Sequence, residues 1–304
     1  MKKVLLIGVL LLTLGACSSK EEESKHVHDY EIVVKDGWKT CIAGKDFNAD
    51  GLKVYKKCKT CGDVEDVDYT LENATDLEMG QTSITIKCGD TSINYPIFVK
   101  EKYHIACVGD SLTAGHYWAN QSYPTKLSNK ITSDYQVENC GVNGISITGY
   151  GGSWDDPEMC YIKQDVYQKS LDFAPDIFAI MLGTNDATNW ASAEPGFLSG
   201  YKELLDSYVE AFPNARFIMM VSPPAITPNQ FSIQNETIRD QVNPIQRDLA
   251  EEYDMELLDL REEFEAVDDY QNKFLRPNDG VHFTEEAADY VAGRAWEITK
   301  DLRF

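Results

Sequence analysis

From residue 103 to the C-terminus, short apolar runs alternate with longer stretches whose apolar residues recur at the spacing of an amphipathic helix. The short runs predict five strands, at residues 105–108, 135–139, 177–182, 217–221 and 256–260. The longer stretches predict helices near residues 123–131, 161–173, 197–212, 238–253 and 284–302. This alternation predicts an α/β domain at residues 101–304, in which a parallel sheet carries helices on both faces. About 200 residues are enough for one such domain with a sizeable core.

Residues 37–100 show a different pattern, in which apolar and polar positions alternate over short segments. The segments 69–71, 82–87 and 93–99 are typical of short strands separated by turns. We therefore predict a small all-β module, built as a β-sandwich. The stretches 45–48 and 51–54 resemble parts of bacterial immunoglobulin-like (Ig-like) surface modules. We interpret the module as a spacer, with carbohydrate binding as the alternative, because a fold alone does not specify a function.

The first 16 residues combine a basic start, Met1-Lys2-Lys3, with an apolar run from Val4 to Leu14. This run is too short to cross a bilayer, which takes about 20 residues. The following Leu14-Gly15-Ala16-Cys17 resembles a bacterial lipobox, which implies that residues 1–16 are a signal peptide and that Cys17 is lipidated. This predicts an extracytoplasmic protein anchored to a bacterial membrane, with residues 17–36 as an acidic tether. An ordinary secretory signal with an incidental cysteine is the alternative.

Ser111 stands at the turn from the first predicted strand of the α/β domain to a helix, in the sequence Gly109-Asp110-Ser111-Leu112. Ligands of open parallel sheets bind outside the carboxyl ends of the strands, so a side chain on this turn faces the crevice. A nucleophilic hydroxyl needs a base to accept its proton and donors that stabilise an oxyanion. Taken alone, a serine at this position is more often a helix cap.

Later strand ends and one late loop supply candidates for these partners. Asp279 and His282 lie three residues apart on one loop, which lets the carboxylate orient the imidazole while the other ring nitrogen points at Ser111. Gly144, in Asn139-Cys140-Gly141-Val142-Asn143-Gly144, can bring a backbone N–H close to a ligand, and Gly141 fits the same description. Asn185, in Gly183-Thr184-Asn185-Asp186, offers a side-chain amide as a further donor.

The four blocks, in this order, resemble the SGNH or GDSL hydrolase family. The resemblance implies a three-layer α/β/α domain with a flavodoxin-like strand order. It also implies that Ser111 is the nucleophile, His282 the base, Asp279 its partner, and Gly144 and Asn185 members of the oxyanion hole. No cofactor and no catalytic metal are expected, because no cluster of histidines and carboxylates accompanies the serine.

Composition narrows the range of substrates. The net charge is −22, with 50 acidic against 28 basic residues, which disfavours nucleic acid as a partner. Aromatic and histidine residues in the loops after the motif strands suit sugar stacking or an acyl slot, with packing under the loops as the alternative: His116, Tyr117, Tyr150, Trp154 and Trp190. We therefore predict a serine esterase acting on an ester substrate, most simply a carbohydrate O-acetylesterase acting on an acetylated glycan. A short-chain lipase or acyltransferase and a non-catalytic surface-binding protein are the alternatives.

The eight cysteines include one close pair, Cys58-Lys59-Thr60-Cys61. With Cys41 or Cys88, or with His26 and His28, this pair has the ligands of a tetrahedral zinc site. Outside a membrane a disulfide is equally reasonable. Cys107 and Cys140 lie in or beside predicted strands, as small buried hydrophobic residues do.

Overall fold

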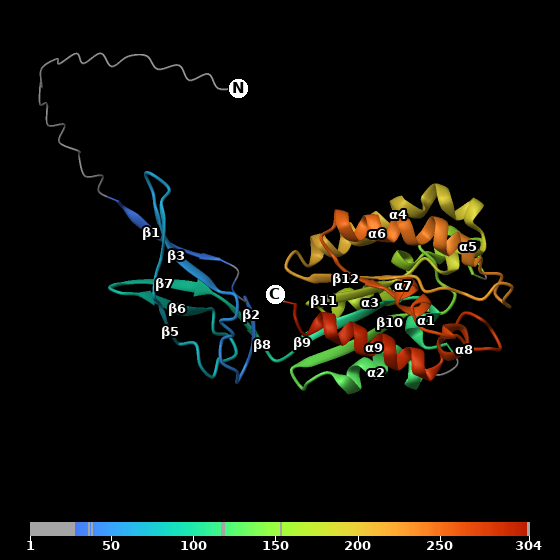
Figure 1. The fold of residues 1–304 in the computed structure, drawn as a ribbon, viewed down its shortest axis with the longest axis horizontal. Helices are drawn as coiled ribbons and strands as arrows, with labels where there is room; N and C mark the ends of the chain where they lie inside the picture. Colours follow the sequence, from blue (N-terminus) through green and yellow to red (C-terminus); the bar gives the residue numbers. More distant parts are fainter. Residues whose placement is uncertain (1–27, 36, 38, 117–118, 153, 303–304) are drawn as a thin grey trace, which may run out of the picture.

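The computed structural model describes residues 28–35, 37, 39–116, 119–152 and 154–302 (Figure 1). The predicted signal peptide and Cys17 lie outside the described residues. None of the described helices is long and apolar enough to cross a membrane. The chain folds into an N-terminal β module followed by an α/β domain, and it passes from one to the other within two residues, between β8 (Phe98–Lys100) and β9 (Tyr103–Gly109).

The α/β domain contains a five-stranded parallel sheet in the order β10-β9-β11-β12-β13. This is the flavodoxin-like order, with the first strand between the second and the third, and the predicted three-layer fold is confirmed. The predicted strands are all present, within a few residues of their expected bounds. Besides β9 they are β10 (Tyr135–Gly141), β11 (Ile177–Met181), β12 (Arg216–Val221) and β13 (Glu256–Asp259).

Each strand divides its side chains between two apolar cores, because successive residues of a strand point to opposite faces. In β11, Ile177, Ala179 and Met181 contribute to one core, while Phe178 and Ile180 contribute to the other. The first core is covered by α2 (Tyr123–Lys130), α7 (Leu260–Glu265), α8 (Tyr270–Phe274) and α9 (Glu285–Thr299). The second is covered by α3 (Asp165–Asp172), α4 (Trp190–Ala211) and α6 (Asn243–Glu252), and Figure 1 shows α4 and α6 across the sheet from α2 and α9.

Several helices differ from the prediction. The helix expected at 161–173 is divided into a 3-10 turn, Tyr161–Lys163, and α3, and the helix expected at 238–253 begins as a π-helical turn, Ile238–Val242, after the short α5 (Asn235–Thr237). Helix α4 begins seven residues before the predicted start, with Pro195 inside it. Trp190 packs edge-on against Phe197 at 5.2 Å between ring centroids, and Ala193 is fully buried, so packing outweighs the local preference of proline against a helix. Helices α7 and α8 are short and were not predicted.

The β module contains two antiparallel sheets and a parallel pair. One sheet has the order β1-β3-β4, the other β5-β6-β7, and β2 pairs with β8. Their bounds are β1 (Tyr30–Lys35), β2 (Thr40–Ile42), β3 (Lys53–Cys58), β4 (Val64–Asp66), β5 (Thr70–Glu72), β6 (Ser83–Cys88) and β7 (Thr91–Pro96). The predicted tether at 17–36 therefore ends too late, because its residues 30–35 form β1. The likeness to Ig-like modules stays a prediction.

Polar contacts join the two parts. Lys100 donates to Asp176 at 2.7 Å, with both side chains largely buried, and Asp176 also accepts the backbone N–H of His104. The hydroxyl of Tyr103 donates to the carbonyl of Thr40 at 2.9 Å. The β module is thus packed on the amino end of the sheet, opposite the strand ends that carry the catalytic motifs.

Candidate active site

Ser111 lies directly after β9, as the first residue of the one-turn helix α1 (Ser111–Ala114). Asp110 caps this turn by accepting the backbone N–H of Leu112 at 2.8 Å. A Cβ on Gly109 would lie 2.1 Å from the hydroxyl of Thr113, so a larger residue has no space at this turn. The tight turn fixes the Ser111 side chain at the carboxyl end of the central strand, largely buried at 8 % exposure.

His282 and Asp279 meet Ser111 from the loop before α9. His282 Nε2 lies 2.8 Å from Ser111 Oγ, and His282 Nδ1 lies 3.1 Å from Asp279 Oδ2. The other oxygen of Asp279 accepts the backbone N–H groups of Val281 and His282, both at 2.8 Å. Burial alone would raise the pKa of Asp279, but the hydrogen bond from His282 and those from the two backbone N–H groups lower it, so the carboxylate stays ionised beside the imidazole. The structure thus brings the three predicted residues into the arrangement of a hydrolytic triad.

The loops after β10 and β11 bring Gly144 and Asn185 to the same place. Both residues line one cavity with Ser111 and His282. Asn185 Nδ2 donates to the carbonyl of Ile145 at 2.8 Å, and since an amide nitrogen carries two hydrogens, the other remains for a ligand. Gly141 has a different role, because a Cβ there would lie 2.2 Å from the backbone nitrogen of Ala114. The geometry therefore favours Gly144 over Gly141 as the glycine that faces the substrate.

Asp186 joins these two loops, and the sequence analysis assigned it no role. Its two carboxylate oxygens accept the backbone N–H groups of Ile147 and Thr148 and the hydroxyl of Thr148, at 2.8–3.1 Å. These bonds hold the segment after Gly144 beside Asn185. The signal was present in the sequence, because Asp186 ends the block that contains Asn185.

The cavity above Ser111 has a volume of about 390 Å³ and mixes polar and aromatic side chains. Trp154 lies at its rim with 45 % of its surface exposed. His116 stacks on His282 at 4.4 Å between ring centroids, and Phe231, which the sequence analysis missed, meets the edge of His282 at 5.0 Å. The remaining lining residues include Asn143, Thr188, Gln230, Ser232 and Ile233.

The predicted aromatic cluster is only partly at this cavity. Trp154 and His116 line it, whereas Trp190 packs in the core with Phe197 and Tyr150 is not among the lining residues. Tyr117 lies outside the described residues. For Trp190, the alternative of packing under the loops, rather than contact with a substrate, was correct.

The sequence profile of the GDSL-like lipase/acylhydrolase family matches residues 107–290, which is more than half of the chain and includes every residue of the candidate site. The chain belongs to this family. It is a GDSL esterase, a serine ester hydrolase, as the sequence predicted.

Individual relatives agree with this assignment. An acetylxylan esterase from Xylanibacter ruminicola is 26% identical over 219 residues, which cover 64% of this chain and 42% of that protein. The chain thus spans less than half the length of this curated relative. Two solved structures share the fold: a putative GDSL-like lipase from Parabacteroides merdae (18% identity, TM-score 0.52, 66% of this chain and 97% of that one) and a putative arylesterase from Agrobacterium tumefaciens (21%, 0.51, 66% and 99%).

Two buried carboxyl groups lie behind the GDSL serine. Burial raises the pKa of Asp110 to about 7 and that of Asp186 to about 6. The hydrogen bonds that each carboxylate accepts lower its pKa, but by less than burial raises it. One oxygen of Asp110 has no hydrogen-bond partner among the described residues. Burial and the nearby His282 lower the pKa of His116. The two carboxyl groups behind Ser111 are therefore shielded from water, where charge interactions are strong.

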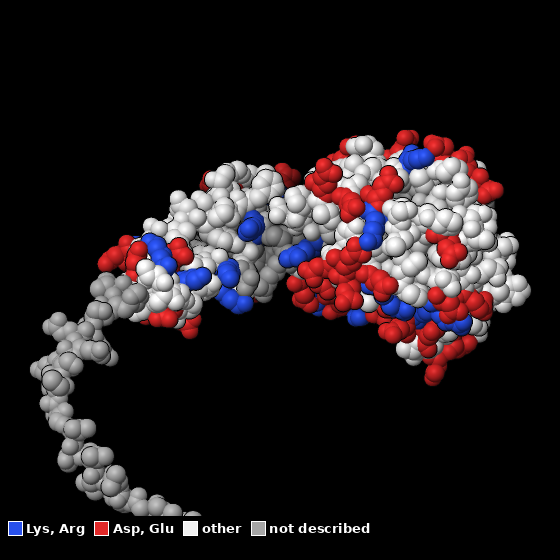
Figure 2. All heavy atoms as spheres, turned by 90° about the horizontal axis from the view of Figure 1, so that it is seen from above, with Lys and Arg blue, Asp and Glu red and all other residues white. Residues whose placement is uncertain are grey.

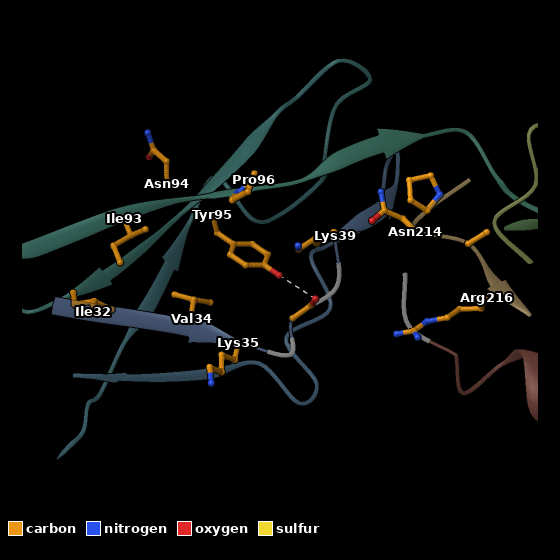
Figure 3. A pocket seen from close by; sticks show the side chains of 13 residues that line it. Ile32, Val34, Lys35, Lys39, Ile93, Asn94, Tyr95, Pro96, Asn214 and Arg216 are labelled. Carbon is orange, nitrogen blue, oxygen red and sulfur yellow. Dashed lines mark hydrogen bonds between the residues drawn. The ribbon is translucent and has the colours of Figure 1, made fainter. Parts of the chain in front are cut away.

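A larger cavity of the esterase, about 820 Å³, lies elsewhere, between the β module and the segment before β12 (Figure 3). Tyr95 and Lys39 line one side and Asn214 and Arg216 the other. Since Arg216 begins β12, this cavity is at the amino end of the sheet and apart from Ser111. Among the described residues, the group of three His, Cys, Asp or Glu side chains placed to hold a metal is also remote from Ser111, in the β module.

Proposed function

We propose that this GDSL esterase removes acetyl groups from a neutral glycan outside the cytoplasm. In this reaction Ser111 Oγ attacks the ester carbonyl and His282 Nε2 accepts its proton. The developing oxyanion is stabilised by the backbone N–H groups of Ser111 and Gly144 and by the Asn185 amide. His282 then protonates the leaving sugar hydroxyl, and a water molecule, activated by His282, releases acetate from the acyl-enzyme.

The observation that carries the glycan proposal is Trp154 at the rim of an otherwise largely polar cavity. An exposed indole face suits stacking on a sugar ring, and Asn143, Gln230 and Ser232 supply hydrogen-bonding groups for its hydroxyls. Beside Ser111 and His282 a second hollow of about 20 Å³ has space for a group no larger than a methyl or a water molecule. These features favour a short acyl group on a carbohydrate over a long-chain lipid.

Charge adds a constraint on the glycan. The chain carries a net charge of −22, and Figure 2 shows acidic side chains spread over the α/β domain with fewer lysines and arginines among them. A surface of this sign repels polyanions, so a neutral polymer fits better than an acidic one. The acetylxylan esterase relative supports the same class of substrate.

The test compares two substrates in the variant Trp154→Ala. Loss of one stacking contact, worth about 1 kcal/mol, should lower kcat/KM on acetylated xylo-oligosaccharides about fivefold and leave p-nitrophenyl acetate nearly unchanged. Trp154→Phe, which keeps an aromatic face, is the matched control and should recover most of the loss. An equal fall on both substrates would mean that Trp154 supports the site rather than the sugar. Preference for long-chain p-nitrophenyl esters would point to a lipase.

Location is tested separately. Palmitate labelling of cells that express the full chain should mark the wild type, and Cys17→Ala should remove the label. Wild-type protein that stays unlabelled and cytoplasmic would refute the anchored, extracytoplasmic part of the proposal.

A further inference from the structure

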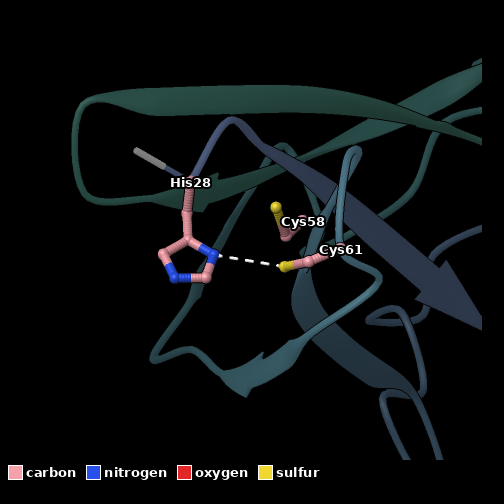
Figure 4. A group of neighbouring side chains, drawn as sticks. All are labelled: His28, Cys58 and Cys61. Carbon is pink, nitrogen blue, oxygen red and sulfur yellow. Dashed lines mark hydrogen bonds between the residues drawn. The ribbon is translucent and has the colours of Figure 1, made fainter. Parts of the chain in front are cut away.

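Three side chains that bind metals meet at one edge of the β module (Figure 4). His28 precedes β1, Cys58 ends β3, and Cys61 lies in the turn between β3 and β4. One ligand atom from each, the two sulfurs and an imidazole nitrogen, lie within 4.8 Å of one another. Cys61 Sγ is 3.3 Å from His28 Nδ1, and Figure 4 shows the sulfur and the ring facing each other.

The backbone positions these groups without any metal. Gly62, at a φ of +80°, donates its N–H to the carbonyl of Cys58 at 2.9 Å, and Cys58 donates to the carbonyl of Asp63 at 2.8 Å. The N–H of Lys59 donates to the carbonyl of Asp29, which ties the turn to the segment that carries His28. The His28 ring is further oriented by stacking on Tyr30, at 5.3 Å between centroids. A closed turn thus holds both cysteines beside a histidine from the segment that leads into β1.

The chemistry of this set is that of a zinc site. Two cysteines and a histidine are three of the four ligands of a common tetrahedral zinc centre, in which ligand atoms are about 3.5–3.8 Å apart. The structure has no disulfide among the seven described cysteines, and Cys41 and Cys88, considered as ligands from the sequence, are not in the group. The carboxylate of Asp63 lies 3.9 Å from His28 Nδ1 but is not in the group. His26 lies outside the described residues.

We propose that His28, Cys58 and Cys61 bind a Zn²⁺ ion that fastens the start of β1 to the turn between β3 and β4. Binding releases the protons of the two thiols to solvent and forms two Zn–S bonds and one Zn–N bond, with no change of oxidation state. The module has a small core to which β4 contributes no residue, so a metal link would supply stability that packing does not. The site is structural, because it is separate from Ser111.

The first test uses the full chain, purified under reducing conditions, stripped of metal with a chelator and then given Zn²⁺ or Co²⁺. About one zinc ion per chain should be retained, and Co²⁺ should give the thiolate charge-transfer and intense visible bands of a tetrahedral thiolate site. Adding zinc should raise the Tm of the stripped protein and leave the hydrolysis of small esters unchanged. No retained zinc, or an octahedral Co²⁺ spectrum, would overturn the proposal.

Variants then assign the ligands. Cys58→Ser with Cys61→Ser should abolish zinc retention and the cobalt bands, and Cys88→Ala, which removes a thiol of the same module outside the group, should retain both. Zinc retained by the double variant would place the metal elsewhere. Peptide mapping of unreduced protein tests the alternative, a Cys58–Cys61 disulfide. Finding that disulfide in the chain as isolated would overturn the zinc site.

Discussion

The α/β domain and the β module are held together in different ways. In β11 all five residues are buried, because helices cover both faces of the sheet, whereas every residue of β4 is exposed. The α/β domain has two extensive cores, and the module has one small core. A domain with this much buried surface can keep polar groups such as Asp110 and Asp186 away from water. The module depends more on local links such as the turn at Cys58–Cys61.

The largest expected effect is on ester turnover and comes from removing the nucleophile of the α/β domain. Ser111→Ala should lower ester turnover by about 10⁴-fold or more, because the nucleophile is removed while the rest of the site remains. The Tm should change little, because the substitution removes one oxygen atom whose hydrogen-bond partner is His282, at the end of the sheet and outside the apolar cores. Steady-state kinetics and thermal melts check this. Turnover above a few per cent of the wild type would remove Ser111 as the nucleophile.

The next largest effect concerns the oxyanion donors. Asn185→Ala should lower kcat about 10²- to 10³-fold with a smaller change in KM, because the donor acts mainly in the transition state. The variant also removes the bond to the carbonyl of Ile145, so a thermal melt must accompany the kinetics. With p-nitrophenyl acetate as substrate, Asn143→Ala is a matched control, since Asn143 lines the same cavity and its proposed contacts are with sugar hydroxyls that this ester lacks. A kcat loss as large in the control as in Asn185→Ala would contradict the assignment.

The same contrast explains what the sequence could predict. Strands buried on both faces are continuous apolar runs, so 177–182 was found almost to the residue, and polar motifs at the ends of such strands indicated Ser111 and Asn185. The strand β4 has no apolar run and gave no signal. In β1 the run Ile32-Val33-Val34 is typical of a strand, and the predicted tether at 17–36 overlooked it. Phe231 reaches the cavity from an irregular loop, which only tertiary structure places. The residues alone fit either Gly141 or Gly144, and the family resemblance implied Gly144. The packing of Gly141 on Ala114 now favours the same choice.

A third effect concerns stability and pH. The pKa of Asp110 is about 7 in the folded chain and about 4 in an unfolded one, so the native state favours the neutral carboxyl. A raised native pKa gives stability that is fully present below about pH 4 and is lost as the pH rises through about 7. Asp110→Asn keeps the acceptor for Leu112 N–H but cannot ionise. Its Tm should therefore match the wild type near pH 4 and exceed it at pH 8.

Asp186→Asn is the contrasting control for that experiment. Both oxygens of Asp186 accept hydrogen bonds, so an amide nitrogen in place of either would face a donor. This variant should be less stable than the wild type at every pH. If Asp110→Asn were also less stable at every pH, the Asp110 carboxylate would be a needed acceptor, and the buried neutral form would be the wrong description.

The smallest effect is expected when the two regions are separated. Residues 103–304 contain the whole sheet, both cores except for Ile42, and every proposed catalytic group. They should therefore fold and hydrolyse p-nitrophenyl acetate within about twofold of the longer chain. The Tm should fall, because Asp176 loses Lys100 and retains its bond to His104 N–H in a partly buried position. Asp176→Asn in the truncated chain should restore part of that loss, since it removes the charge left without its partner. A well-folded truncated chain with a large fall in turnover would show that the β module contributes to the active site, and the view of it as a spacer would then be wrong.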